Sequence, residues 1–151
     1  AGRAAAALVR AAALEGPCRA VLVQAGYHQI VIKFIQEVLS KSPRNIKRQD
    51  IAKSTTGLHY LTNLTLFPDG LEAVMKDDQF APLLRTFLAT DAASFQRGGG
   101  EDLSLSHPLL MAIPARILAL TLLRNVCLNR ARRDALLGDA GAWRSTQAAA
   151  A

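Results

Sequence analysis

The fold of this chain is decided by residues 56–75, which read TGLHYLTNLTLFPDGLEAVM. Leucine recurs at helical spacing from Leu58 to Leu64, so this part predicts a helix with one apolar face. Pro68 cannot continue a helix interior, and the Asp-Gly pair that follows it has turn chemistry. A second apolar face with helical spacing begins directly after the turn, at residues 71–75. The stretch therefore predicts a helix, a sharp turn and a short second helix.

The same pattern recurs further along the chain and, more weakly, near its start. Residues 120–128 (LTLLRNVCL) align with residues 58–66 (LHYLTNLTL), which places Asn125 on Asn63. Residues 8–13 take the corresponding place in a first copy. A helical unit that repeats implies stacked units, none of which can bury its own apolar face alone. The sequence predicts repeat units at about 1–39, 49–90 and 108–147, joined by loops at 40–48 and 91–107.

Within these units, turn residues and apolar periodicity place the individual helices. We expect helices over residues 2–15, 17–25, 27–39, 50–66, 70–77, 80–90, 115–128 and 131–138. Gly57 falls inside one of them, and a glycine there favours close packing of a neighbouring helix over a ligand contact. No stretch predicts a convincing strand, so the fold class is all-α.

Composition agrees with a globular helical protein that has an acidic partner. Of the 151 residues, 50% are apolar and 20% are charged, and only 5% are aromatic. The apolar content excludes a disordered chain, and the scarcity of aromatics favours helices packed through small residues. The formal net charge is +6, which favours nucleic acid, an acidic protein tail or an anionic surface as partner.

Several other classes are excluded or disfavoured by the sequence. No apolar run is long enough for a membrane span, and no secretory signal is visible. Cys18 and Cys127 lie far apart, which predicts buried free thiols in a reducing compartment. Two cysteines and three scattered histidines are too few for a zinc site, so no metal or cofactor is expected. The chain begins without a methionine and its last repeat is incomplete, so we expect a segment of a longer protein.

Two short patterns resemble those of a known family of helical repeats. Residues 23–26 (VQAG) and 137–141 (LGDAG) are similar to the boundary between the first and second helices of armadillo repeats. Residues 58–64 and 120–126 are similar to the end of the long third helix in that family. The resemblance implies an armadillo-like solenoid, a right-handed superhelix of three-helix repeats. HEAT repeats and other α-solenoids share the general helical pattern.

A narrower resemblance concerns residues 122–127 (LLRNVC) and the long inter-repeat loops. Both are similar to features of large eukaryotic scaffolds of centrioles and cilia of the rotatin type. This resemblance implies a cytoplasmic, cytoskeletal location in a cilium, axoneme or centriole, with tubulin or axonemal and centriolar proteins as partners.

In peptide-binding armadillo proteins, an asparagine on each third helix holds an extended peptide, and a tryptophan one turn earlier packs against it. Asn63 and Asn125 match the asparagine, whereas His59 and Thr121 stand where the tryptophan would be. The two asparagines therefore either contact a peptide or bond the backbone between stacked helices. The partner-binding surface implied by the resemblance, on the concave face, consists of His59, Tyr60, Asn63, Thr121, Arg124 and Asn125.

Clustered basic residues suggest an electrostatic rim beside that surface. The loop at 41–48 carries four basic residues and no acid, and it is either a solvated connection or a contact for phosphate or an acidic tail. A second basic group begins at Arg124, and it lacks the interleaved aromatics that single-stranded nucleic acid would stack on. The rim residues are Lys41, Arg44, Lys47, Arg48, Arg130, Arg132 and Arg133.

The sequence contains little that could perform catalysis. His28, His59 and His107 lie in different segments and have no carboxylate partner at catalytic spacing. The acidic pair Asp77-Asp78 is placed to cap a turn. No Walker, HExxH, nucleophile-elbow or dinucleotide-binding motif occurs. We therefore expect a non-catalytic scaffold that binds other proteins through acidic or extended segments, with no small-molecule substrate. The alternatives are a nucleic-acid-binding solenoid and an importin-like carrier of peptide motifs.

Overall fold

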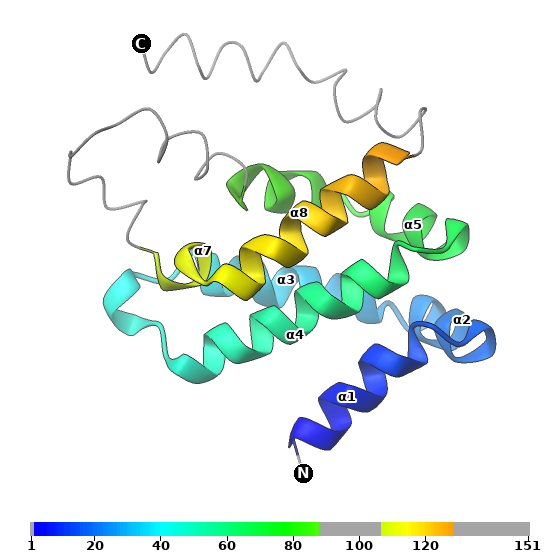
Figure 1. Cartoon of the computed structure of the whole chain (residues 1–151), viewed down its shortest axis with the longest axis horizontal. Helices are drawn as coiled ribbons and strands as arrows, with labels where there is room; N and C mark the ends of the chain where they lie inside the picture. The colour runs from blue at the N-terminus through cyan, green and yellow to red at the C-terminus, as the bar shows by residue number, and fades with distance from the viewer. Residues whose placement is uncertain (1, 88–106, 129–151) are drawn as a thin grey trace, which may run out of the picture.

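The structure, a computed structural model, describes residues 2–87 and 107–128, and within these two ranges it contains helices and no strand (Figure 1). This confirms the all-α class. The elements are α1 (Gly2–Ala12), α2 (Gly16–Gln24), α3 (Tyr27–Leu39), the 3-10 turn η1 (Pro43–Asn45), α4 (Arg48–Leu64), α5 (Pro68–Met75), α7 (Pro108–Met111) and α8 (Ile113–Leu128). A further helical segment is described over residues 80–87.

Proline and glycine set the helix boundaries, as the sequence predicts. Pro17, Pro68 and Pro108 each lie in the first turn of a helix, where a missing N–H group costs no hydrogen bond. Gly26 separates α2 from α3 with φ 66°, a left-handed conformation that favours glycine. The observed bounds of the predicted helices lie close to the predicted ones, whereas the sequence predicts neither η1 nor α7. The predicted helix at 131–138 lies outside the described residues, as does the predicted loop at 91–107 apart from His107.

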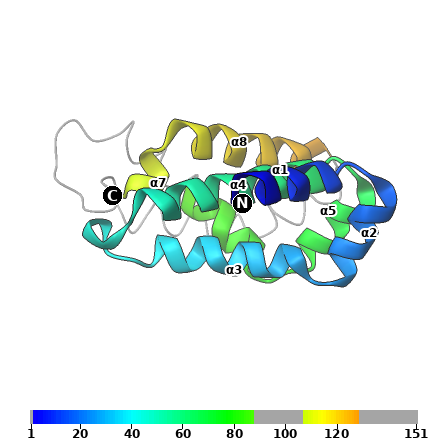
Figure 2. The same ribbon diagram turned by 90° about the horizontal axis from the view of Figure 1, so that it is seen from below.

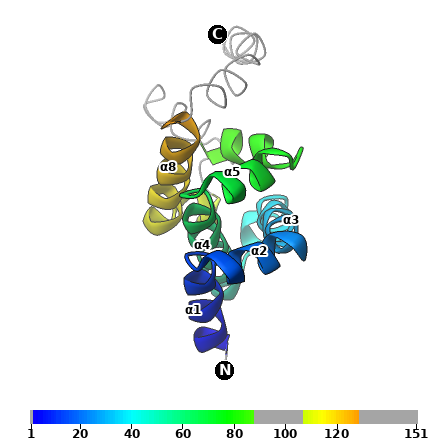
Figure 3. The same cartoon turned by 90° about the vertical axis from the view of Figure 1, so that its right-hand side faces the viewer.

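The helices form two layers. Helix α4 contacts α1 on one side and α8 on the other, and the three run side by side in the same direction (Figures 1 and 2). The second layer contains α2, α3 and α5, with α3 packed against both α4 and α5 (Figure 3). Viewed from the end, the first layer advances from α1 through α4 to α8, and the second from α2 and α3 to α5.

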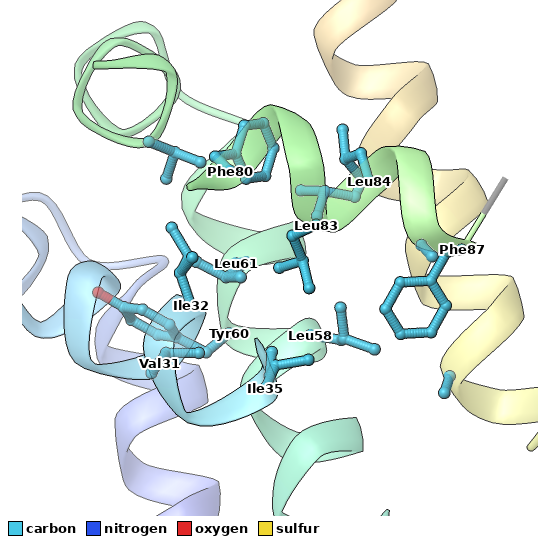
Figure 4. Packing of buried hydrophobic residues seen from close by; sticks show 14 of the residues in the cluster. Val31, Ile32, Ile35, Leu58, Tyr60, Leu61, Phe80, Leu83, Leu84 and Phe87 are labelled. Carbon is cyan, nitrogen blue, oxygen red and sulfur yellow. The ribbon is translucent and has the colours of Figure 1, made fainter. Parts of the chain in front are cut away.

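The core lies between the two layers and consists mainly of aliphatic and aromatic side chains (Figure 4). Helix α3 supplies Ile32 and Ile35, and α4 supplies Leu58 and Leu61, all fully buried. Gly57 of α4 allows the close approach of α3, because a Cβ atom there would lie 2.8 Å from Cγ1 of Val31. The predicted packing role of this glycine is confirmed.

The cysteines differ from the sequence prediction. Both are free thiols, but Cys18 is exposed and Cys127 is only half-buried. Cys18 lies on α2, a helix without a single buried residue, so its side chain has no core to enter. The expectation of two buried thiols is therefore wrong.

Candidate functional site

The predicted partner-binding residues lie on α4 and α8, but they do not share one face. His59 and Asn63 point towards α1, where both contact Arg10. Asn125 points from α8 towards the opposite side of α4. His59 and Asn63 thus lie in the contact between α4 and α1, whereas Asn125 lies in the contact between α8 and α4.

Asn63 bonds the backbone of the neighbouring helix. Its Nδ2 donates to the carbonyl oxygen of Arg10 in α1 at 3.0 Å. The bond joins helices that are distant in sequence, so it fixes how α4 sits along α1. Of the two roles open to this asparagine from the sequence, the structure shows the inter-helix one.

Asn125 makes the matching bond on α8 and is more deeply buried. Its Nδ2 donates to the carbonyl oxygen of Thr62 at 3.2 Å and to Oγ1 of Thr65 at 3.1 Å. The residue is only 6% exposed. A side chain so enclosed and so bonded has no donor directed at solvent, which corrects its placement on a partner-binding surface.

Tyr60 also belongs to the core and not to a binding surface. It is 1% exposed, and its ring meets that of Tyr27 edge-on with centroids 5.1 Å apart. Burial raises the pKa of the Tyr60 hydroxyl well above its usual value, and Tyr27 raises it further. The expectation that Tyr60 contacts a partner is corrected, because its position on α4 faces α3 in the second layer.

The surroundings of His59 favour the neutral form of its ring. Its Nδ1 lies 3.2 Å from Nη1 of Arg10, in a half-buried position. Desolvation lowers the pKa of His59, and the nearby guanidinium of Arg10 lowers it further. A neutral ring can accept a hydrogen bond from Arg10, so the contact stabilises the packing of α1 on α4.

Thr121 and Arg124 occupy the accessible part of α8. Thr121 is half-buried, and its Oγ1 donates to the carbonyl oxygen of Ile117 in its own helix. Arg124 is exposed. Of the predicted surface residues, Arg124 is the one that offers a full side chain to solvent.

The basic rim is exposed as predicted over the part that the structure describes. Lys41, Arg44, Lys47 and Arg48 are all accessible. Asp50 accepts hydrogen bonds from the backbone N–H of Lys47 at 3.2 Å and from Nζ of Lys41 at 3.1 Å. These contacts lower the pKa of Asp50, with the Lys47 backbone bond as the larger cause. Arg130, Arg132 and Arg133 lie outside the described residues.

The histidines and acidic residues of the described part make local structural contacts. No group of three or more His, Cys, Asp and Glu side chains among the described residues could hold a metal ion. His107 caps α7, with Nδ1 accepting from the Leu109 N–H and Nε2 donating to the carbonyl of Val38 at 3.3 Å. Asp77 accepts from the N–H of Gln79 at 2.9 Å, which is the predicted turn cap.

Two features of the surface were not predicted from the sequence. Arg19 of α2 bonds Asp69 at the start of α5, with Nε 2.9 Å from Oδ2, and its guanidinium lies 3.8 Å over the ring of Phe67. The partners are far apart along the chain, so no local pattern indicates them. The second feature is a row of exposed apolar side chains on α8, from Ile113 to Leu120. Their helical spacing is visible in the sequence, but their exposure is not.

Comparison with protein-family models, curated proteins and solved structures found no match. Within the described part of the chain, no helix has the length and apolar character needed to cross a membrane.

Proposed function

We propose that the chain is a segment of an armadillo-like solenoid and serves as a non-catalytic scaffold that binds other proteins. The observation that supports this proposal is the layered order of α1, α4 and α8, each contacting the next. In that order, two asparagines at matching repeat positions make matching hydrogen bonds. A stack of similar units that exposes a long side surface suits the holding of partners.

The exposed apolar side chains at both ends of the stack also support a solenoid segment. Leu8 on α1 and Ile30 on α3 are 69% and 61% exposed at the N-terminal end. Ile117 on α8 is 57% exposed at the other end. Large apolar groups in such numbers are typical of surfaces that a neighbouring unit or a partner covers.

The partner that we propose is an acidic, extended protein segment. Arg44 and Arg48 lie in or beside the loop before α4, both exposed. Their partner would be glutamate-rich, as tubulin tails are, which agrees with the proposed location in a cilium, axoneme or centriole. Because the Asn63 and Asn125 amides are engaged inside the layer, we place the contact on the rim and not on an asparagine ladder.

A direct test uses a fluorescent glutamate-rich peptide, such as a tubulin tail, and the wild-type chain. Binding is measured by anisotropy for the double variant Arg44→Glu/Arg48→Glu and for the control double variant Lys33→Glu/Lys76→Glu. Both variants change the net charge equally, so the difference between them reports position. We expect about a tenfold loss of affinity for the rim variant and a much smaller loss for the control.

The same titration separates the alternatives. Tighter binding of single-stranded RNA than of the acidic peptide, with affinity falling steeply with salt, would favour the nucleic-acid-binding solenoid. Preferential binding of a lysine-rich peptide would favour the importin-like carrier. Equal losses for the rim and control variants would contradict the proposed rim.

A further inference from the structure

The two asparagine bonds are successive steps of one pattern. In the alignment of residues 58–66 with residues 120–128, Asn63 matches Asn125 and Thr62 matches Arg124. Asn63 donates to the carbonyl of Arg10, and Asn125 donates to the carbonyl of Thr62. Helix α4 is therefore a donor towards α1 and an acceptor towards α8. The pattern has a direction, and the carbonyl of Arg124 occupies the next acceptor position.

The face of α8 around that carbonyl is apolar and open. Ile113, Ile117 and Leu120 are 69%, 57% and 48% exposed, and their spacing places them on one side of the helix together with Arg124. The buried residues of α8, such as Ala119 and Leu122, lie on the opposite side.

The matching face of α4 is covered. Leu58 and Thr62 correspond to Leu120 and Arg124, and they are 0% and 6% exposed. Thr62 lies against α8, since its Oγ1 also contacts the carbonyl of Leu118 at 3.4 Å. In the alignment of the two helices, the residues of α4 that α8 covers therefore correspond to the residues of α8 that are exposed.

We propose that this face of α8 is the docking site for a further helical unit of the same repeat series. Its incoming helix runs parallel to α8, covers the stripe of Ile113, Ile117 and Leu120, and carries an asparagine that donates to the carbonyl of Arg124. The proposal rests on the proposed repeat architecture, but it does not depend on which partner the scaffold binds.

A second copy of this chain does not fit the site. Both Asn63 and Asn125 already donate to carbonyls of their own chain. Helix α1 has Ala11 at the place of the asparagine and therefore lacks the donor. The continuity of the series from α1 through α4 to α8 indicates a following unit and not self-association.

The test extends the chain by one unit. A copy of residues 67–128 is inserted directly after Leu128, so that the copied α8 can pack on the original one. Leu120→Cys in the original helix reports docking through its rate of reaction with a maleimide reagent. Cys18, which is exposed on α2, is the internal control for access of the reagent.

We expect Leu120→Cys to react about tenfold more slowly in the extended chain than in the original chain, with Cys18 unchanged. Replacing the copied Asn125 by Ala restores most of the rate, whereas replacing the copied Gln79, which is exposed in the original chain, by Ala does not. Equal rates in the two chains would overturn the proposal, as would protection that is indifferent to the copied Asn125.

Unfolding and sedimentation measurements on the extended chain test whether the added unit folds onto the original helices and whether the chain stays monomeric. Independent unfolding of the added unit, with the midpoint of the original helices unchanged, would also refute docking. Sedimentation must show a monomer, because protection that appears only in a dimer would assign the face to self-association. Binding of the acidic peptide is measured separately on the original chain. A negative result for docking on α8 therefore does not bear on peptide binding at the rim, and the reverse also holds.

Discussion

Asn63 and Asn125 make the same hydrogen bond at two successive contacts of one helical layer, each to a backbone carbonyl of the preceding helix. The two bonds differ in their surroundings. Asn125 is 6% exposed and also bonds Thr65, whereas Asn63 is half-buried. If the asparagine is removed, water can replace its hydrogen bond more easily at the half-buried Asn63 than at the buried Asn125.

Replacement of these asparagines should therefore have unequal costs. We expect Asn125→Ala to lower the free energy of unfolding by about 1–3 kcal/mol and Asn63→Ala by about 1 kcal/mol. Asn45→Ala, at an exposed position in η1, is the matched control and should change stability by less than about 0.5 kcal/mol. Urea unfolding followed by circular dichroism measures all three. A larger loss for Asn63→Ala than for Asn125→Ala would contradict the structure.

Gly70 should tolerate no side chain. A Cβ atom there would meet the carbonyl oxygen of Leu64 and would lie 2.8 Å from Cδ1 of the same residue. We expect Gly70→Ala to cost about 2 kcal/mol or more, because backbone cannot move away as a side chain can. Gly16→Ala is the control, since its Cβ would have only Arg19 Nη2 at 3.9 Å. Thermal unfolding that shifts equally in the two variants would show that Gly70 is not tightly packed.

The ion pair of Arg19 and Asp69 should make stability depend on acidity. Hydrogen bonding by Arg19 lowers the pKa of Asp69 below its usual value of 3.8. The folded state thus favours the charged carboxylate. The stability that this adds is fully present above the pKa of Asp69 in the unfolded chain, and it is lost as the pH falls through the lower pKa of Asp69 in the folded chain.

We therefore expect Asp69→Asn to be less stable than wild type at pH 7, with the difference vanishing in strong acid. Urea unfolding at a series of pH values measures this difference. Asp78→Asn, which removes the charge of another exposed carboxylate, is the matched control. A constant difference between wild type and Asp69→Asn at every pH would rule out the ion pair as its cause.

His28 should make the stability depend on pH in a second range, which is less acidic than that of Asp69. It is 5% exposed, and its Nδ1 has no hydrogen-bond partner in the structure. Burial lowers the pKa of His28 below 6.5, although the nearby Asp77 partly raises it. The unfolded chain then binds more protons than the folded one, so stability falls as the pH drops below the unfolded pKa.

The direct measurement is an NMR titration of the His28 ring, and we expect its midpoint below 6.5. The variant His28→Gln should show a flatter decline of stability between about pH 7 and pH 5. A His28 midpoint at or above 6.5 would show that the attraction of Asp77 exceeds the cost of burial.

Much of the fold could be predicted from local sequence signals. Pro17 gives the start of α2, and Gly26 gives the turn between α2 and α3. These residues act through their own backbone geometry, which does not depend on distant parts of the chain. The alignment of residues 58–66 with residues 120–128 is also visible in the sequence. This alignment allows the hydrogen bonds of Asn63 and Asn125 to be compared.

The candidate site could be predicted only in part. The exposure of Arg44 and Arg48 follows from their charge and their place in a loop. The burial of Tyr60 does not follow from its neighbours, because a helix with apolar residues around most of its circumference can face several ways. Likewise, nothing local marks Arg19 as the partner of Asp69 on another helix.

The sequence by itself determined the approximate bounds of most helices, that no strand competes with them in the described residues, and which segments resemble one another. Only the tertiary structure decided that Asn63 and Asn125 bond neighbouring helices, that Tyr60 enters the core and that the stripe on α8 is open. The physical reason is that apolar periodicity and turn residues act within one helix. The direction in which each face points is set by packing against helices that lie far away in the sequence.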